Sequence, residues 1–392
     1  MRAAQKVVQA VAVAATKRFL SLALACAWCL SAPLPAAVLP ADRADALYHS
    51  YDGGGVQVQG PSILVRKQVG QSVSVSANYY VDNISSASID VMATASPYKE
   101  SRTQKSVGVD YLHDRTTMSV NYINSEEHDY LAKTASFTLN QDMFGDLTTV
   151  TMGYSKGWDV VGMRNDPTFK KDANRQNYRI GLSQVVTKNT LVGLNFETIT
   201  DDGFLNNPYR AVRYVDPTSP KGYSYQAEVY PQTRTSNAVS VRGMYYLPYR
   251  ASVHGEFRIY SDSWGIRAKS AEVGYTHPKG DTWTFDVKYR YYTQSNADFY
   301  SDLFPYRDAQ NFMARDKELA AFKSNTVGLG VSYAFARGGW GFVDSGTVNL
   351  SWDHIQFHYE DFRNVLAGGT PGQEPLYGYS ANVVQFFVSV WY

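Results

Sequence analysis

Cysteine is nearly absent from this sequence. The 392 residues include 2 cysteines, Cys26 and Cys29, and both lie in a segment that we expect to be removed on export. The mature chain would therefore have no disulfide, no zinc-thiolate site and no haem-attachment motif of its own.

The sequence also lacks an excess of charge of either sign. Its 37 Lys and Arg residues are matched by 36 Asp and Glu residues, so the charge balance does not indicate nucleic-acid binding. Only 19% of the residues are charged, while aromatic residues reach 14%, and the 44% that are hydrophobic are spread thinly. This composition excludes a disordered chain and a helical membrane bundle.

Residues 1–37 have the features of a secretory signal peptide. They contain four basic residues and no acidic residue, an apolar run at 20–30, and a small-residue stretch that ends at residue 37. The apolar run is shorter than the roughly 20 residues that a membrane anchor needs, which favours a cleaved signal. Residues 23–26 loosely resemble a lipoprotein cleavage box, so acylation of Cys26 is an alternative for this end of the chain.

Beyond residue 55, apolar and polar residues alternate in segments of about ten to thirteen residues. In 71–82, 250–262 and 281–294 the apolar residues fall mostly on odd-numbered positions, such as Phe285 and Val287, and the even-numbered positions are mostly polar. Strands of soluble sandwiches alternate too, but they are about half this length. Long strands with large aromatics on the apolar face predict an all-β fold, namely a transmembrane antiparallel up-and-down barrel.

The last residues of the chain support the same prediction. Phe386, Val388 and Val390 occupy alternate positions, and the sequence ends on Tyr392. This pattern resembles the C-terminal assembly signal of bacterial outer-membrane barrels. We therefore expect the bacterial outer membrane as the location, with outer-membrane lipid, lipopolysaccharide and the barrel-assembly machinery as partners and no nucleic acid. A periplasmic or loop-binding protein partner is left open.

The strand number follows from how the connections alternate. Tight turns belong to the periplasmic side of such barrels and longer connections to the outside. The connections assigned to the outside are 83–104, 126–130, 157–176, 200–235, 262–265, 295–324 and 360–379. Counting from residue 72 gives fourteen strands, with twelve and sixteen as alternatives. Because Gly60 and Pro61 argue against an earlier strand, we expect residues 38–68 to form a periplasmic or lumen-inserted segment and residues 69–392 to form the barrel.

The polar parity of the strands should line the lumen, and its charged residues form the candidate site. They are Asp110, Arg179, Glu197, Arg242, His254, Glu256, Arg258, Glu272, Asp286, Lys288 and Arg290. Both signs of charge occur in this set, so the lumen should be wet without strong ion selectivity. The alternative is a ladder of cross-strand ion pairs that stiffens the barrel without conducting.

Three basic residues lie on the lipid-facing parity. Lys133, Arg267 and Lys269 each fall near the start of a strand that descends from the outside. A charge costs little at this height, where it can meet lipopolysaccharide phosphates. We expect a lipid-phosphate rim, unless these strands simply extend beyond the membrane.

Segment 344–359 breaks the alternation. Its apolar positions are even as far as Trp352 and odd from Ile355 onward. A bulge near Asp353 would explain the change.

The candidates for a catalytic site are the His and Asp residues expected at the outer rim. His128 with Asp129 and Asp353 with His354 loosely resemble the groups of omptin-type proteases. Neighbouring residues of a strand point to opposite faces, so neither pair is a preformed dyad. We expect no enzyme, no cofactor and no metal, with a rim hydrolase as a minor alternative.

Several segments together resemble a known family. Residues 47–55, 72–82, 85–90, 95–100 and 111–114 are similar to an uncharacterised Gram-negative family, domain of unknown function 3570, and the resemblance covers nearly all of the mature chain. It implies an outer-membrane barrel and supplies no substrate, catalytic residue or cofactor. Folding of 85–100 into the mouth as a constriction is our hypothesis for that stretch.

These observations favour a channel or uptake component for small hydrophilic solutes. The alternative is a non-conducting barrel that binds or sheathes a partner, with Tyr-rich outer loops among 157–176, 200–235 and 295–324 as the contact. Conductance would separate the two.

Overall fold

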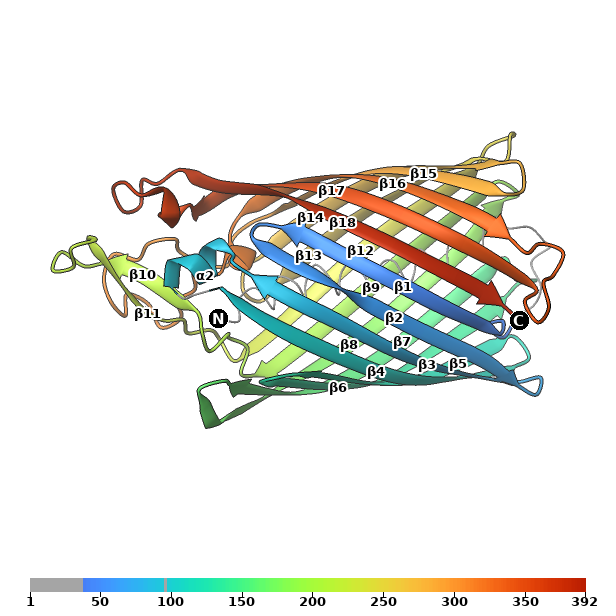
Figure 1. The fold of residues 1–392 in the computed structure, drawn as a ribbon, viewed down its shortest axis with the longest axis horizontal. Helices are drawn as coiled ribbons and strands as arrows, with labels where there is room; N and C mark the ends of the chain where they lie inside the picture. The colour runs from blue at the N-terminus through green and yellow to red at the C-terminus, as the bar shows by residue number, and fades with distance from the viewer. Residues whose placement is uncertain (1–37, 95–96) are drawn as a thin grey trace.

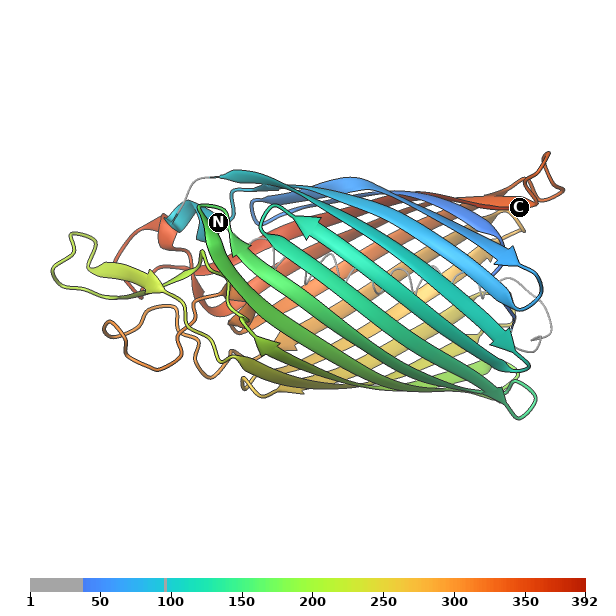
Figure 2. The same ribbon diagram turned by 90° about the horizontal axis from the view of Figure 1, so that it is seen from below.

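The chain forms a closed antiparallel barrel in a computed structural model that describes residues 38–94 and 97–392 (Figure 1). Sixteen strands follow one another around the wall, and β1 closes the barrel by pairing with β18. Figure 2 shows the same tilted strands from below. Residues 1–37, the expected signal peptide, lie outside the described residues.

The barrel strands are mostly 11 to 16 residues long, with two longer ones, as membrane-length strands require. They are β1 (Arg43–Gly53), β2 (Val56–Val69), β3 (Val73–Ser86), β4 (Tyr98–His113), β5 (Thr116–Glu127), β6 (Tyr130–Met143), β7 (Thr148–Met163), β8 (Asp166–Thr187), β9 (Thr190–Gly203), β12 (Thr233–Tyr246), β13 (Ser252–Asp262), β14 (Arg267–Lys279), β15 (Trp283–Gln294), β16 (Phe322–Phe335), β17 (Ser345–Arg363) and β18 (Leu376–Trp391).

A few elements stand apart from the wall. β10 (Ala211–Val215) pairs with β11 (Tyr223–Ala227) in a separate two-stranded sheet. The helical pieces are α2 (Ile89–Thr94), η1 (Lys317–Leu319) and η2 (Val365–Ala367). No helix in the described part of the chain is long and apolar enough to span a membrane.

The two faces of the wall follow the sequence alternation. Val107 and Phe257 leave 57% and 51% of their surface exposed on the outer face, while polar neighbours such as Ser106 and Arg258 point inward and are partly covered. This pattern runs through β3, β13 and β15 as predicted, because side chains alternate across a strand.

The predicted count of fourteen strands is wrong, because residues 43–69 add a hairpin to the wall. β1 pairs along its whole length with β2, and the two strands lie between β18 and β3. They are connected by Gly54 and Gly55, whose φ angles are 60° and 77°. A tight hairpin turn needs such positive φ angles, which residues other than glycine rarely adopt. The expected free segment at 38–68 is therefore mostly barrel strand. A hairpin adds two strands at once, so the even-number argument could not separate fourteen from sixteen.

Gly60 and Pro61 do not break β2. The pairing of β2 with β3 skips these two residues, running from Gln59 with Asn83 to Ser62 with Tyr80. Pro61 lies on the exposed face, and a Cβ on Gly60 would lie 1.9 Å from the carbonyl oxygen of Val81. The local irregularity lets the strand continue without the proline N–H.

The connections differ between the two ends of the barrel. One end, which we call the short-turn end, carries tight turns such as 70–72 and 114–115 and the last residue of the chain. The other, the long-loop end, carries α2 with the loops 204–232, 295–321 and 364–375. This asymmetry agrees with the sequence prediction.

One predicted loop is strand instead. Residues 157–176 belong to β7 and β8, which are joined at 164–165, and this stretch contains no tyrosine. Charged and polar residues in 164–176 concealed its extended structure. The tyrosines of the long-loop end lie mainly in 204–232, at Tyr209, Tyr214, Tyr223, Tyr225 and Tyr230.

The predicted bulge near Asp353 is also wrong. β17 pairs in continuous register with β18 from Ser345 to His358, and the register shifts only between His358 and Arg363. Phe357 and Tyr359 point inward and are buried. These inward-facing side chains are apolar because they pack in the buried cluster at the long-loop end. The two apolar parities of this segment therefore need no bulge.

The hydrophobic core lies inside the long-loop end. Phe299 and Leu319 of loop 295–321 pack with Tyr51, Val58 and Tyr359 of the wall in one buried cluster. Ile89 and Val91 of α2 and Tyr98 belong to the same cluster, and the constriction that we expect from 85–100 stays a prediction. Extensive apolar burial of this kind holds the loops against the barrel.

Candidate functional site

Four of the predicted lumen residues form a single row across neighbouring strands. Arg242 on β12 lies opposite Glu256 on β13, which lies opposite Glu272 on β14, which lies opposite Arg290 on β15. The row therefore presents two adjacent carboxylates between two guanidinium groups. Like charges directly opposite each other destabilise a sheet, and the flanking arginines offset this repulsion.

The next row toward the short-turn end contains His254 and Lys288. Lys288 Nζ lies 2.9 Å from Asp353 Oδ2 on β17, with Gly328 between them in the register. A Cβ on Gly328 would come within 2.3 Å of Asp353 Oδ1, and one on Gly274 within 2.3 Å of the His254 ring. The two glycines leave space for these side chains.

Asp353 was missed as a lumen residue, and its predicted place at the outer rim is wrong. It is buried on the inner face in the middle of β17, whereas His354 points outward and contacts Asn382. The signal was present in the sequence, because Leu350 and Trp352 set the outward parity and leave Asp353 on the inner one.

A third group lies where β8, β9 and β13 meet the lumen. Glu197 Oε2 lies 2.9 Å from Arg258 Nη2, and Glu197 Oε1 lies 3.1 Å from Arg179 Nε. Asn177 donates a further hydrogen bond of 2.9 Å to Glu197. The side chain of Arg179 faces inward and is 53% exposed, so other side chains do not fill the lumen around it.

The remaining two predicted residues are placed differently. Asp286 accepts a 2.6 Å hydrogen bond from Thr276. It lies two residues from Lys288 on β15, toward the short-turn end. Asp110 on β4 lies across the barrel from this cluster, bonded to Arg66 at 2.5 Å and to Ser119. The structure therefore unites most of the predicted set on β8, β9 and β12–β17, but not Asp110.

The facing wall has a different composition. Most inward positions in the middle of β5, β6 and β7 carry small neutral residues, including Asn121, Ser136, Thr138, Thr151 and Ser155, while Asp142 and Asp159 lie near the strand ends. Several glycines accompany them. Charged residues of the inner wall thus lie on β8–β17 and again on β2–β4, where Arg66 pairs with Asp110 and Arg102 pairs with Asp82, and a stretch rich in hydroxyl and amide groups lies between them.

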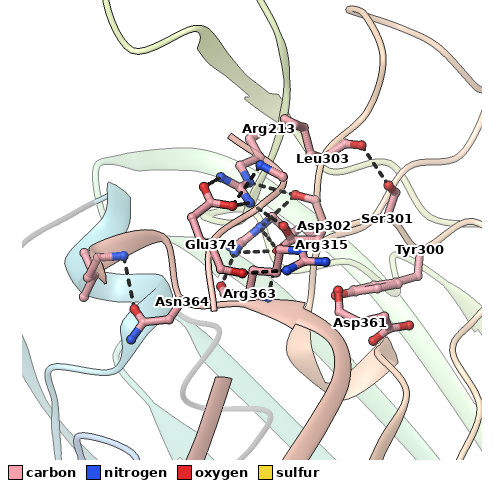
Figure 3. Close-up of polar contacts among 12 residues, drawn as sticks. Arg213, Tyr300, Ser301, Asp302, Leu303, Arg315, Asp361, Arg363, Asn364 and Glu374 are labelled. Atoms are coloured by element: carbon pink, nitrogen blue, oxygen red, sulfur yellow. Dashed lines mark hydrogen bonds and ion pairs between the residues drawn. The ribbon is translucent and has the colours of Figure 1, made fainter. Parts of the chain in front are cut away.

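A second cluster of charges lies in the loops and was not predicted (Figure 3). Arg213 on β10 is fully buried and pairs with Asp302 and with Glu374, whose Oε1 lies 2.5 Å from Arg213 Nη1. Arg315 Nη2 lies 2.9 Å from Asp302 Oδ1, and Arg363 donates a 2.6 Å hydrogen bond to the carbonyl oxygen of Glu374. Burial opposes ionisation of Glu374, but the hydrogen bond from Arg213 keeps its pKa below the usual range.

Further buried pairs extend this cluster. Arg210 pairs with Asp316, and Glu228 accepts hydrogen bonds from the Arg315 backbone at 2.8 Å and from the Tyr230 hydroxyl at 2.7 Å. Burial raises the pKa of Glu228 to about 7; nearby Asp316 raises it too, and Arg210 acts in the opposite direction.

These contacts join three loops into one unit, which we call the cap: residues 204–232, 295–321 and 364–375. The joined residues are 89 and 161 positions apart in the chain. The cap also contacts the far side of the mouth, where Tyr209 donates a 2.6 Å hydrogen bond to Asp129. No local pattern in the sequence marks such long-range pairing, so sequence reasoning could not find it.

The predicted rim residues lie on the outer face. Lys133 on β6 and Arg267 and Lys269 on β14 are exposed on the outward parity. Asp129 accepts the hydrogen bond from Tyr209 of the cap. His128 is exposed at the turn 128–129. Within the described residues no group of three or more His, Cys, Asp or Glu is arranged to hold a metal ion.

Comparison with known proteins gives one family and several barrels. A family model described as "Protein of unknown function (DUF3570)" matches residues 88–345. No curated protein sequence matches.

Three solved structures illustrate the barrels found. A loop L8 deletion mutant of OmpT, an outer membrane protein of Vibrio cholerae, is 11% identical, covers 90% of this chain and 99% of its own, and has a TM-score of 0.42. A Pseudomonas aeruginosa FadL homologue is 10% identical, with coverages of 89% and 90% and a TM-score of 0.41. A bacterial polysaccharide outer membrane secretin is 8% identical, with coverages of 90% and 100% and a TM-score of 0.47. At such values these structures assign no function to this chain.

Proposed function

The chain belongs to the family described as "Protein of unknown function (DUF3570)", and from its barrel geometry we propose that it is an outer-membrane channel or uptake component for small hydrophilic solutes. The exposed apolar outer face is suited to lipid, because water would make it an aggregation-prone surface. The short-turn end then faces the periplasm and the long-loop end the outside. In this proposal the pattern at Phe386, Val388, Val390 and Tyr392 on β18 serves as the assembly signal.

The observation that carries the proposal is the charged inner wall, part of which is exposed. Arg179 is about half exposed although it points into the barrel, and the row from Arg242 to Arg290 spans four neighbouring strands. A barrel of sixteen strands is wide enough to leave an aqueous lumen.

The charges on the wall indicate which solutes would pass. A wall that carries both signs of charge suits solutes that are polar rather than strongly anionic or cationic.

The cap decides access from outside. Its core packs against the inner wall, and its ion pairs hold the three loops together. We propose that solutes enter only when the cap loosens, so that the cap acts as a cover for the lumen. Residues 38–68 have no such role, because most of them are wall strands.

Single-channel conductance in planar bilayers tests this function. We expect the mature protein to give rare or small steps, and the Arg213→Ala variant to give frequent steps because the cap is no longer held together. Silence in both forms would rule out a channel.

One observation favours the second candidate, a barrel that binds a partner. The cap presents exposed apolar side chains on a surface held together by ion pairs, including Tyr306 and Leu366. This second function would be supported if the protein gives no conductance steps but binds a defined ligand through Tyr306.

A further inference from the structure

A row of polar and basic residues crosses the outer face of four neighbouring strands. Lys105 on β4 lies opposite Asn124 on β5, Asn124 lies opposite Lys133 on β6, and Lys133 lies opposite Trp158 on β7. The positions have outward parity, on the same face as Val107, Tyr122 and Phe137. We call these four residues together with Lys156 the lysine row.

Lys156 adds a third positive charge beside the row. It lies opposite Ala135, two residues from Lys133 along β6, and its Nζ is 5.5 Å from the centre of the Trp158 ring. The ring therefore helps to hold this ammonium group near Lys133.

The lysine row lies at the border of the apolar outer face. On each strand the next outward residues toward the short-turn end are mainly apolar or aromatic, including Val107, Tyr122 and Tyr154. Toward the long-loop end the outward residues are polar on β4 and β5, at Thr103 and Glu126, and apolar on β6 and β7, at Leu131 and Val160. Lys105 and Asn124 therefore lie where the apolar outer face ends, which is the height of lipid headgroups if the barrel spans a membrane.

None of the three lysines forms an ion pair with any residue in 38–94 or 97–392. The nearest outward acid is Glu126, which accepts a 2.9 Å hydrogen bond from Asn124, so the patch holds three positive charges against one negative. Lys323, on the other side of the barrel, differs because it is paired with Glu360 at 2.5 Å. The lysine row is thus an outward-facing surface with a net positive charge, whose lysines are not engaged in ion pairs within the described residues.

We propose that the lysine row binds the headgroup of a glycolipid that carries two phosphate groups. Lys105 and Lys133 are two strands apart, which is about 10 Å, so they can each meet one phosphate of the same molecule. Charge-assisted hydrogen bonds from ammonium to phosphate are strong at a surface bordering lipid. The acyl chains then pack against the apolar outward residues on the short-turn side of the row. Lys133 was expected at a lipid-phosphate rim from the sequence; the register adds Lys105, Asn124, Lys156 and Trp158.

Native mass spectrometry of the mature protein in a non-ionic detergent tests the proposal. The probes are diphosphoryl lipid A, monophosphoryl lipid A, phosphatidylglycerol and inorganic phosphate, each added alone. The Lys105→Gln/Lys133→Gln variant is compared with Lys188→Gln/Lys279→Gln, which removes the same charge at the short-turn end. Heat-modifiable migration on a gel establishes that each variant is a folded barrel, and the single Lys133→Gln variant serves if the double one does not fold.

The expected result is retention of diphosphoryl lipid A that falls at least about tenfold in the row variant and less than twofold in the control. Monophosphoryl lipid A should bind more weakly than the diphosphoryl form. Equal retention by row variant and control would overturn the proposal, as would phosphatidylglycerol binding as tightly as lipid A. Displacement of lipid A by millimolar inorganic phosphate would reduce the row to a site for free anions. The readout is independent of conductance, so the site and the channel can fail separately.

Discussion

The lumen and the cap use the same charged residue types in opposite ways. In the cap, Arg213, Asp302 and Glu374 are buried and paired. In the lumen, Arg242 and Glu256 lie side by side on a wet wall, and Arg179 is half exposed. The difference is the degree of contact with water.

Burial makes each cap contact costly to lose. A buried charge without its partner is destabilised by several kcal/mol, whereas a charge that faces water is solvated when its partner is removed. The cap therefore uses charge to hold three loops in one arrangement. The lumen wall can change its charges with little effect on folding, so its charges are available to a solute.

The largest expected effect follows removal of the central cap arginine. Arg213→Ala leaves Asp302 and Glu374 buried without their main partner, which should destabilise the cap by about 3–5 kcal/mol. Limited proteolysis should then cut loops 204–232 and 364–375 while the barrel stays resistant. A cleavage pattern identical to that of the wild type would contradict the role given to Arg213, and Arg290→Gln in the lumen is the matched control.

The cap should also respond to pH. Burial raises the pKa of Glu228 to about 7, so its contribution is complete below the unfolded-state pKa near 4.5 and is lost as the pH rises through about 7, at up to about 1.4 kcal/mol per pH unit. Glu374, whose pKa is lowered, loses its contribution as the pH falls below about 4.5. Loop proteolysis measured from pH 4 to 8 should be slowest near pH 5. In Glu228→Gln the increase toward pH 8 should disappear; an unchanged profile would exclude Glu228 as the cause.

A half-buried lumen pair should give an intermediate effect. Lys288→Met leaves Asp353 without its 2.9 Å partner, and we expect a loss of about 1–3 kcal/mol in barrel stability. Thermal unfolding followed by circular dichroism gives the value. A loss as large as that of Arg213→Ala would mean that the lumen wall is as dry as the cap, and the comparison would not hold.

The smallest effect on stability is expected at the open lumen row. Arg242→Gln/Arg290→Gln removes two charges that face the lumen, and the loss of stability should stay within about 1 kcal/mol, the cost of leaving Glu256 opposite Glu272 without the flanking arginines. If the barrel conducts, its reversal potential in a salt gradient should shift toward cation preference, because Glu256 and Glu272 remain. An unshifted potential in a conducting barrel would place the ion path elsewhere.

Local patterns explain which parts of this protein could be predicted. Period-two alternation assigned the inner and outer faces of β13 and β15 correctly, because side-chain direction depends only on position in a strand. The same rule would have placed Asp353 in the lumen if the buried aromatics Phe357 and Tyr359 had not suggested a bulge. Proline and glycine rules failed at Gly60 and Pro61, because an irregular pairing with β3 accommodates them.

The sequence by itself determined that long alternating strands form a barrel with an apolar outer face and a charged inner wall, since each strand carries that pattern within its own residues. Only the tertiary structure decided that β1 closes on β18, that Lys105 and Lys133 share a row, and that Arg213 meets Asp302 and Glu374. These contacts join residues tens to hundreds of positions apart, and their geometry depends on the register and closure of the whole wall. Loops have no periodic pattern from which such pairing could be inferred.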